Sequence, residues 1–153
     1  MSTSTTSMGP ITKTVEVSCG VDHAFRVFTE RIADWWPVEL FSIHGTETTP
    51  RVDGGTGGEI YEISPAGERA HWADVEAWEP PTRLVLAWRV NPEDRAATEI
   101  EVRFEEVEPG LTRVELTHRN WELLGAERGA QARAGYDEGW DAVLPRYEAA
   151  AAG

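Results

Sequence analysis

The feature of this sequence that most constrains its fold is a run of five short segments with strand patterning between residues 59 and 118. They cover residues 59–64, 70–78, 83–90, 98–107 and 111–118. The stretches between them, "SPAGE", "EPPT", "NPED" and "EPG", each combine Pro or Gly with polar residues, as hairpin connections do. Five consecutive strands joined by such short turns predict an antiparallel sheet.

Three of these segments have one apolar face and one polar face. The apolar faces hold Leu84, Leu86, Trp88 and Val90, then Ile100, Val102 and Phe104, then Val114, Leu116 and His118. An antiparallel sheet with this patterning keeps water on its polar face and needs a cover on the apolar one. The sequence must therefore supply a covering element elsewhere.

The stretch "GYDEGWDAVLPRYEAA" near the end of the chain predicts that cover. Its apolar residues recur at steps of three and four, the period of a helix, and are Tyr136, Trp140, Val143, Leu144 and Tyr147. We expect a helix over about residues 126–149, kinked near Pro145. Interior Gly and Pro cost a helix about 1 and about 3 kcal/mol relative to Ala. Burial of Trp140 against the sheet would offset that loss.

The remaining segments complete a single α+β domain. Residues 11–17 alternate like a strand, residues 21–36 have helical spacing, and residues 38–58 resemble a loop. We expect a disordered tail over residues 1–10 and one domain over residues 11–153, with six or seven strands in its sheet.

Composition excludes several classes of partner. The net charge is -13 and Lys13 is the one lysine in the chain, so binding to duplex nucleic acid or to an anionic membrane is not expected. Cys19 is the single cysteine, so no internal disulfide forms. No secretion signal or membrane-spanning stretch is apparent. We expect a cytoplasmic protein, either a monomer or a homodimer.

No motif predicts a metal site, a cofactor or a catalytic residue. The four histidines have no zinc-ligand spacing, and "DGGTGGE" lacks the Lys-Ser/Thr of a phosphate loop. Asp74 and Glu76 share a strand face with Trp72 and Trp78 and are expected to be solvated, so they do not form a catalytic pair. His118 lies on an apolar strand face, where it would be either a hydrogen-bonded core residue or a general base.

The ordered set "VEVSCGVDHAFRVFTE", "WWP", "EPPTRLVLAW", "RVELTH" and "GYDEGWDAVL" resembles the START-like, birch-pollen-allergen-like superfamily (SRPBCC). The similarity is to the branch that resembles the C-terminal domain of the activator of the ninety-kilodalton heat-shock protein's ATPase. This resemblance covers the chain from about residue 11 and implies a helix-grip fold, in which a curved sheet wraps a long C-terminal helix around an apolar cavity. Superfamily members commonly bind apolar small molecules there.

These observations lead to one hypothesis and two alternatives. The hypothesis is binding of an apolar or aromatic small molecule in a cavity lined by Trp36, Phe41, Tyr61, Trp88, His118, Tyr136 and Trp140. The first alternative is a co-chaperone-like interaction module, which would have a filled core and an exposed patch. The second is an enzyme of the polyketide cyclase or dehydratase type, with a polar residue of perturbed pKa in the cavity.

Overall fold

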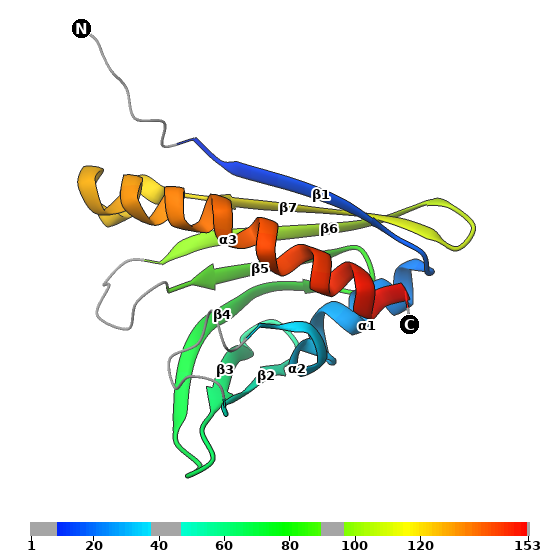
Figure 1. Ribbon diagram of the computed structural model, residues 1–153, viewed down its shortest axis with the longest axis horizontal. Coiled ribbons are helices and arrows are strands. Elements are labelled where there is room, and N and C mark those ends of the chain that lie inside the picture. Colours follow the sequence, from blue (N-terminus) through cyan, green and yellow to red (C-terminus); the bar gives the residue numbers. More distant parts are fainter. Residues whose placement is uncertain (1–8, 38–46, 90–96, 153) are drawn as a thin grey trace, which may run out of the picture.

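The computed structural model describes residues 9–37, 47–89 and 97–152, and its main feature is a curved antiparallel sheet (Figure 1). The sheet has seven strands in the order β1-β7-β6-β5-β4-β3-β2. They are β1 (Ile11–Val17), β2 (Thr49–Asp53), β3 (Glu59–Ile63), β4 (Arg69–Glu79), β5 (Arg83–Trp88), β6 (Thr98–Glu108) and β7 (Leu111–Arg119). Neighbouring strands are antiparallel throughout, so the predicted sheet is confirmed.

The helices of the described residues lie in two parts of the chain, between β1 and β2 and after β7. They are α1 (Val21–Thr29), α2 (Ile32–Trp35), the 3-10 helix η1 (Trp121–Leu124) and α3 (Ala126–Ala152). Helix α3 runs along the inside of the curved sheet (Figure 1). The Nζ atom of Lys13 on β1 lies 2.8 Å from Asp137 and 3.1 Å from Asp141 of α3. This ion pairing ties the helix to the sheet edge, and the fold is the predicted helix grip.

Helix α3 buries the apolar stripe that predicted it. Trp140, Val143, Leu144 and Tyr147 are all buried. The helix begins at Ala126, as expected, and extends to Ala152 with Pro145 inside it. The kink expected at that proline remains a prediction.

Two segments differ from the sequence-based expectation, and the first is the helix predicted over 21–36. It is divided into α1 and α2 at Arg31, whose φ of -107° and ψ of 27° are not helical. Because Ile32 and Trp35 still face the core, the apolar spacing continues across the break and does not reveal it. Trp36 then follows α2 in extended conformation.

The second difference is β2, which lies within the segment expected to be a loop. It is an edge strand that pairs with β3. An edge strand tolerates Pro50, because one side of its backbone needs no partner. Pro50 is buried between exposed Thr49 and Arg51, so the strand alternates, but over too few apolar residues to be recognised.

Strand β4 is irregular where it faces the core. Its register with β3 shifts between Ile60 and Tyr61, so that Ile60 pairs with Ala73 and Tyr61 with His71. Trp72 is therefore the extra residue of a bulge, and both it and Ala73 are buried. Asp74 and Glu76 are exposed, as predicted. The prediction that Trp72 shares their solvated face is wrong, because the bulge turns the indole inward.

Candidate functional site

Four tryptophans from different parts of the chain meet on the concave side of the sheet. We call Trp36, Trp72, Trp88 and Trp140 the tryptophan cluster. The ring of Trp36 lies 5.1 Å from that of Trp72, 5.9 Å from that of Trp88 and 6.1 Å from that of Trp140, centroid to centroid. The cluster thus joins the end of α2 with β4, β5 and α3. All four side chains are buried, so they form a continuous aromatic surface inside the fold.

His118 on β7 connects this cluster to the sheet through both of its ring nitrogens. The indole N–H of Trp140 donates to His118 Nδ1 over 3.1 Å. His118 Nε2 lies 2.8 Å from Thr98 Oγ1, and that hydroxyl donates to the carbonyl of Trp88 over 3.1 Å. Because the Thr98 proton is used there, we assign the imidazole proton to Nε2, which donates to Thr98.

This geometry makes His118 a neutral structural residue. The ring has no exposed surface, and burial lowers its pKa from 6.5 to about 3 because the charged form is poorly solvated there. Protonating Nδ1 would also oppose the Trp140 N–H. Neither nitrogen is available as a general base, so of the two roles considered for His118 the structure supports the hydrogen-bonded core residue.

Tyr136 lies at the margin of the cluster and is partly buried. Its hydroxyl accepts the indole N–H of Trp88 over 2.9 Å. Its ring lies 5.0 Å from the ring of His118 and 5.7 Å from that of Trp121. Trp121 is fully buried and donates its own N–H to the carbonyl of His118 over 3.0 Å. These contacts hold the α3 side of the site to β7 and η1.

Glu62 brings a carboxylate to the other side of the cluster. It lies on β3 and has no exposed surface. Its Oε1 accepts the indole N–H of Trp72 over 2.7 Å. A buried carboxylate is costly unless it is hydrogen-bonded, so the bond to Trp72 fixes its position next to the aromatic surface.

The opposite end of the concave side is filled by a second set of rings. Phe25 and Phe28 of α1 pack on Phe104 at 5.2 and 5.8 Å, and Phe28 also lies 5.1 Å from Tyr147. The hydroxyl of Tyr147 donates to the carbonyl of Ala24 over 2.8 Å. This end joins α1 to α3 and serves as core.

Five of the seven predicted lining residues come together, namely Trp36, Trp88, His118, Tyr136 and Trp140. Tyr61 lies elsewhere: its ring is covered by the guanidinium of Arg69, 3.8 Å from the ring centroid, and its hydroxyl is 3.4 Å from Asp53. Phe41 falls outside the described residues.

Sequence reasoning missed Trp72, Glu62 and Thr98. The bulge at Trp72 reverses the face that simple alternation assigns to it. The burial of Glu62 agrees with strand alternation. Glu62 lies two residues after buried Ile60, so the two side chains share one face of β3. Its residue type does not indicate a buried position, because glutamate usually lies on the polar surface.

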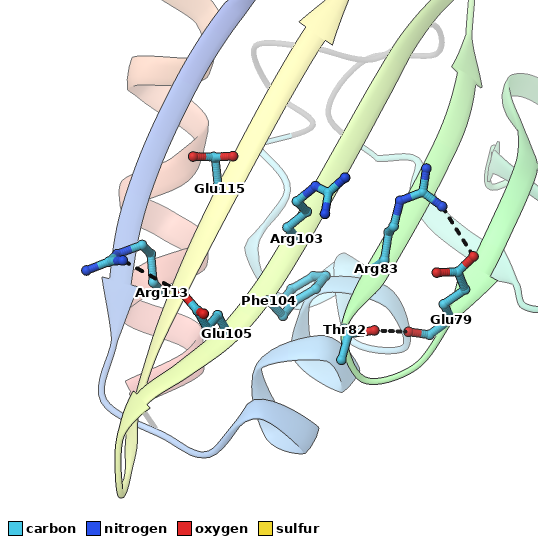
Figure 2. Close-up of a pocket in the computed structure, with 8 residues that line it drawn as sticks. All are labelled: Glu79, Thr82, Arg83, Arg103, Phe104, Glu105, Arg113 and Glu115. Atoms are coloured by element: carbon cyan, nitrogen blue, oxygen red, sulfur yellow. Dashed lines mark hydrogen bonds and ion pairs between the residues drawn. The ribbon is translucent and has the colours of Figure 1, made fainter.

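The convex face of the sheet carries an open groove of about 540 Å³. Figure 2 shows the eight residues that line it, which are Glu79, Thr82, Arg83, Arg103, Phe104, Glu105, Arg113 and Glu115. Its arginines already face carboxylates: Arg83 lies 3.2 Å from Glu79, and Arg103 lies 2.9 Å from Glu101. This alternation of charge is typical of the solvated face of a sheet.

The described part of the chain contains no group of three or more His, Cys, Asp and Glu side chains that could hold a metal ion. In the same residues, no helix is both long and apolar enough to cross a membrane.

Two solved structures are similar to this chain over nearly its whole length. A solved structure titled "An anthrahydroquino-Gama-pyrone synthase Txn09 complexed with SUM" is 32% identical and has a TM-score of 0.64, covering 96% of this chain and 99% of the other. CalC, a self-sacrificing resistance protein from Micromonospora echinospora, is 26% identical with a TM-score of 0.70, covering 94% of each chain.

The fold is also that of the Aha1 dimer from Colwellia psychrerythraea, which is 21% identical, with a TM-score of 0.66 and coverage of 95% and 97%. No curated protein matches the chain. The model of the family described as "Activator of Hsp90 ATPase homolog 1-like protein" matches residues 19–151. This match spans most of the chain, and the protein therefore belongs to the Activator of Hsp90 ATPase homolog 1-like family.

Proposed function

We propose that the protein binds a planar aromatic small molecule against the tryptophan cluster, between the concave face of the sheet and α3. The observation that carries the proposal is the convergence of four indoles from the end of α2, β4, β5 and α3. Small-molecule sites are lined mainly by apolar and aromatic side chains with a few placed polar groups. Here the polar groups are the carboxylate of Glu62 and the hydroxyl of Tyr136.

The hydrogen bonding of the indoles supports a stacking role for their faces. Trp72, Trp88 and Trp140 each donate their N–H to a protein acceptor. The rings are therefore held at their edges, and a ligand would contact their π-faces without having to satisfy these N–H groups. Aromatic stacking of this kind contributes about 0.5–1.5 kcal/mol per pair beyond the burial of area.

One similar protein supports the same class of ligand. The 32% identical structure is titled a synthase of an anthrahydroquino-γ-pyrone, a name that describes a fused aromatic product. It matches this chain over nearly its whole length.

The test is a titration of tryptophan emission with 2-methoxyanthraquinone, whose fused planar rings suit such a surface. We expect saturable quenching at a stoichiometry near one. Trp88→Phe should weaken binding roughly two- to ten-fold. Trp78→Phe is the matched control, because Trp78 packs on Phe25 at 5.2 Å, away from the cluster. Absence of saturable quenching, or equal affinities in the two variants, would contradict the proposal.

A second candidate function is catalysis of ring closure on such a molecule. It is favoured by the 32% identity to a protein titled as a synthase. With both nitrogens engaged and its pKa lowered to about 3 by burial, His118 is not suited to take a proton. A catalytic role would therefore fall on Glu62 or Tyr136. Conversion of a fused-ring phenolic precursor, followed by mass spectrometry, would separate catalysis from binding alone.

The interaction-module alternative stays a prediction. It rests on the family description and predicts an exposed apolar or acidic patch. Within the described residues, Leu123 is the large hydrophobic side chain that is exposed, which offers little apolar surface to a protein partner.

A further inference from the structure

Consecutive hydrogen bonds join two members of the tryptophan cluster, Trp140 on α3 and Trp88 on β5. The indole N–H of Trp140 donates to Nδ1 of His118 over 3.1 Å. Nε2 of His118 lies 2.8 Å from the hydroxyl of Thr98, which donates to the carbonyl of Trp88 over 3.1 Å. The two indole rings lie 6.5 Å apart, centroid to centroid. The bonds therefore connect the covering helix to the sheet at the proposed ligand site.

Thr98 occupies a position from which its hydroxyl reaches both of its partners. It is the first residue of β6 and pairs in register with Trp88, the last residue of β5. Two residues further along β6, and so on the same strand face, Ile100 pairs with His118 of β7. Thr98 is buried, and a buried hydroxyl is costly unless it is hydrogen-bonded. The two bonds that the hydroxyl makes offset that cost.

The hydroxyl of Thr98 determines which nitrogen of His118 carries the proton. Because the hydroxyl proton is donated to Trp88, the oxygen accepts the proton on Nε2. Nδ1 then keeps the lone pair that the Trp140 N–H requires. Without the hydroxyl, a protonated Nε2 would be a buried donor without that acceptor, which is unfavourable. The other tautomer would turn an N–H of His118 towards the N–H of Trp140, so the bond to Trp140 is weakened in either case.

We propose that Thr98 is a positioning residue of the ligand site, which fixes the tautomer of His118 and thereby holds the Trp140 indole in the orientation that stacks on the ligand. The inference rests on the proposed function and adds a residue that acts on the ligand through others. The N–H groups of Trp72 and Trp88 donate to oxygen atoms, whereas that of Trp140 depends on a nitrogen that can itself be protonated. An indole oriented before binding avoids the ordering cost of a mobile side chain.

The first experiment titrates tryptophan emission with 2-methoxyanthraquinone in two variants of Thr98. Thr98→Val keeps the shape of the side chain and removes the hydroxyl, so the affinity should fall roughly two- to ten-fold, as expected for a stacking contact that is lost. Thr98→Ser keeps the hydroxyl and should bind within about two-fold of the wild type. Wild-type affinity in Thr98→Val, or an equal loss in Thr98→Ser, would overturn the inference.

Thr112→Val is the matched control. Thr112 is also buried, and its hydroxyl donates to a backbone carbonyl, that of Cys19, over 2.8 Å. The same substitution there removes the same kind of bond away from the tryptophan cluster. We expect Thr112→Val to lower stability in urea unfolding and to keep the wild-type affinity for the probe. An equal loss of affinity in Thr112→Val and Thr98→Val would assign the effect to general destabilisation and refute the inference.

Nuclear magnetic resonance tests the same inference in the wild-type protein, so the result does not depend on the folding of a variant. A long-range proton–nitrogen correlation spectrum should show His118 protonated on Nε2 and unprotonated on Nδ1. Saturating 2-methoxyanthraquinone should shift the indole N–H signal of Trp140, because a stacked ring lies over it. A proton on Nδ1 in the wild type, or an unchanged Trp140 signal at saturation, would contradict the inference.

The outcomes separate this inference from the proposed function. If the probe binds the wild type and Trp88→Phe weakens it, but Thr98→Val binds as the wild type does, Thr98 is not a positioning residue, although the aromatic site stands. If the probe does not bind the wild-type protein, the aromatic site and this inference both fail.

Discussion

Lowering the pH below about 6.5 should destabilise this protein through His118. Burial lowers the pKa of His118 from 6.5 to about 3, whereas the unfolded chain takes up a proton near 6.5. Below that value the unfolded state binds more protons than the folded state. Stability therefore falls as the pH decreases from about 6.5 towards 3 and is fully present above 6.5.

The size of the effect follows from the two pKa values. Between about pH 7 and pH 5, linkage gives a loss of about 2 kcal/mol in the free energy of unfolding. Glu101 contributes little over this range. Burial raises its pKa, but hydrogen bonds from Arg83 and Arg119 outweigh burial and lower the pKa below 4.5. Stability from such groups is lost at lower pH.

The assay is urea unfolding at several pH values, followed by circular dichroism. His118→Asn keeps one donor and one acceptor but cannot titrate, so its stability should depend less on pH over this range, whatever its absolute stability. His23→Asn is the matched control, because His23 is only partly buried on α1, and it should keep the wild-type slope.

Nuclear magnetic resonance gives a direct check. The Hε1 shift of His118 should stay constant from neutral pH down to about pH 4. A shift that titrates with a midpoint near 6.5 in the folded protein would refute the reasoning, because it would mean that the imidazolium is tolerated inside the hydrogen-bond network.

Three further outcomes are expected from the same structure. Trp140→Phe keeps the aromatic packing but removes the donor to His118 Nδ1, so chemical unfolding should show a loss of about 1–3 kcal/mol. Tyr147→Phe removes the bond to the carbonyl of Ala24 and should cost about 1 kcal/mol in the same assay. With a net charge of -13, the protein should give no salt-dependent complex with duplex DNA in a gel-shift assay at micromolar protein.

The parts of the fold that could be predicted are those with regular periodicity. Strands β5, β6 and β7 alternate regularly over their apolar residues, because the register shift of the β6–β7 pair lies beyond them, between Glu106 and Glu108, so the positions of Trp88 and His118 follow from parity. The stripe of α3 gave Trp140 in the same way. These three residues lie together in the structure, because a helix that covers a one-sided sheet brings the two apolar faces into contact.

The parts that could not be predicted depend on local departures from that periodicity. One extra residue in β4 turns Trp72 inward, and alternation contains no sign of where such a bulge falls. Tyr61 lies apart from the cluster for a related reason: its parity on β3 is opposite to that of Ile60 and Glu62, so its ring packs under Arg69. The sequence predicts the strand, but without a register it does not tell which face of the strand turns to the core.

The hydrogen bonds of the tryptophan cluster show which polar groups hold its indole rings in place. His118 uses both nitrogens within the protein, one for Trp140 and one for Thr98, and an imidazole held in this way stabilises the aromatic surface without reacting. Two further polar groups are bonded to the tryptophan cluster at other points. Glu62 is attached to the cluster through Trp72 on β4, and Tyr136 through Trp88 on β5.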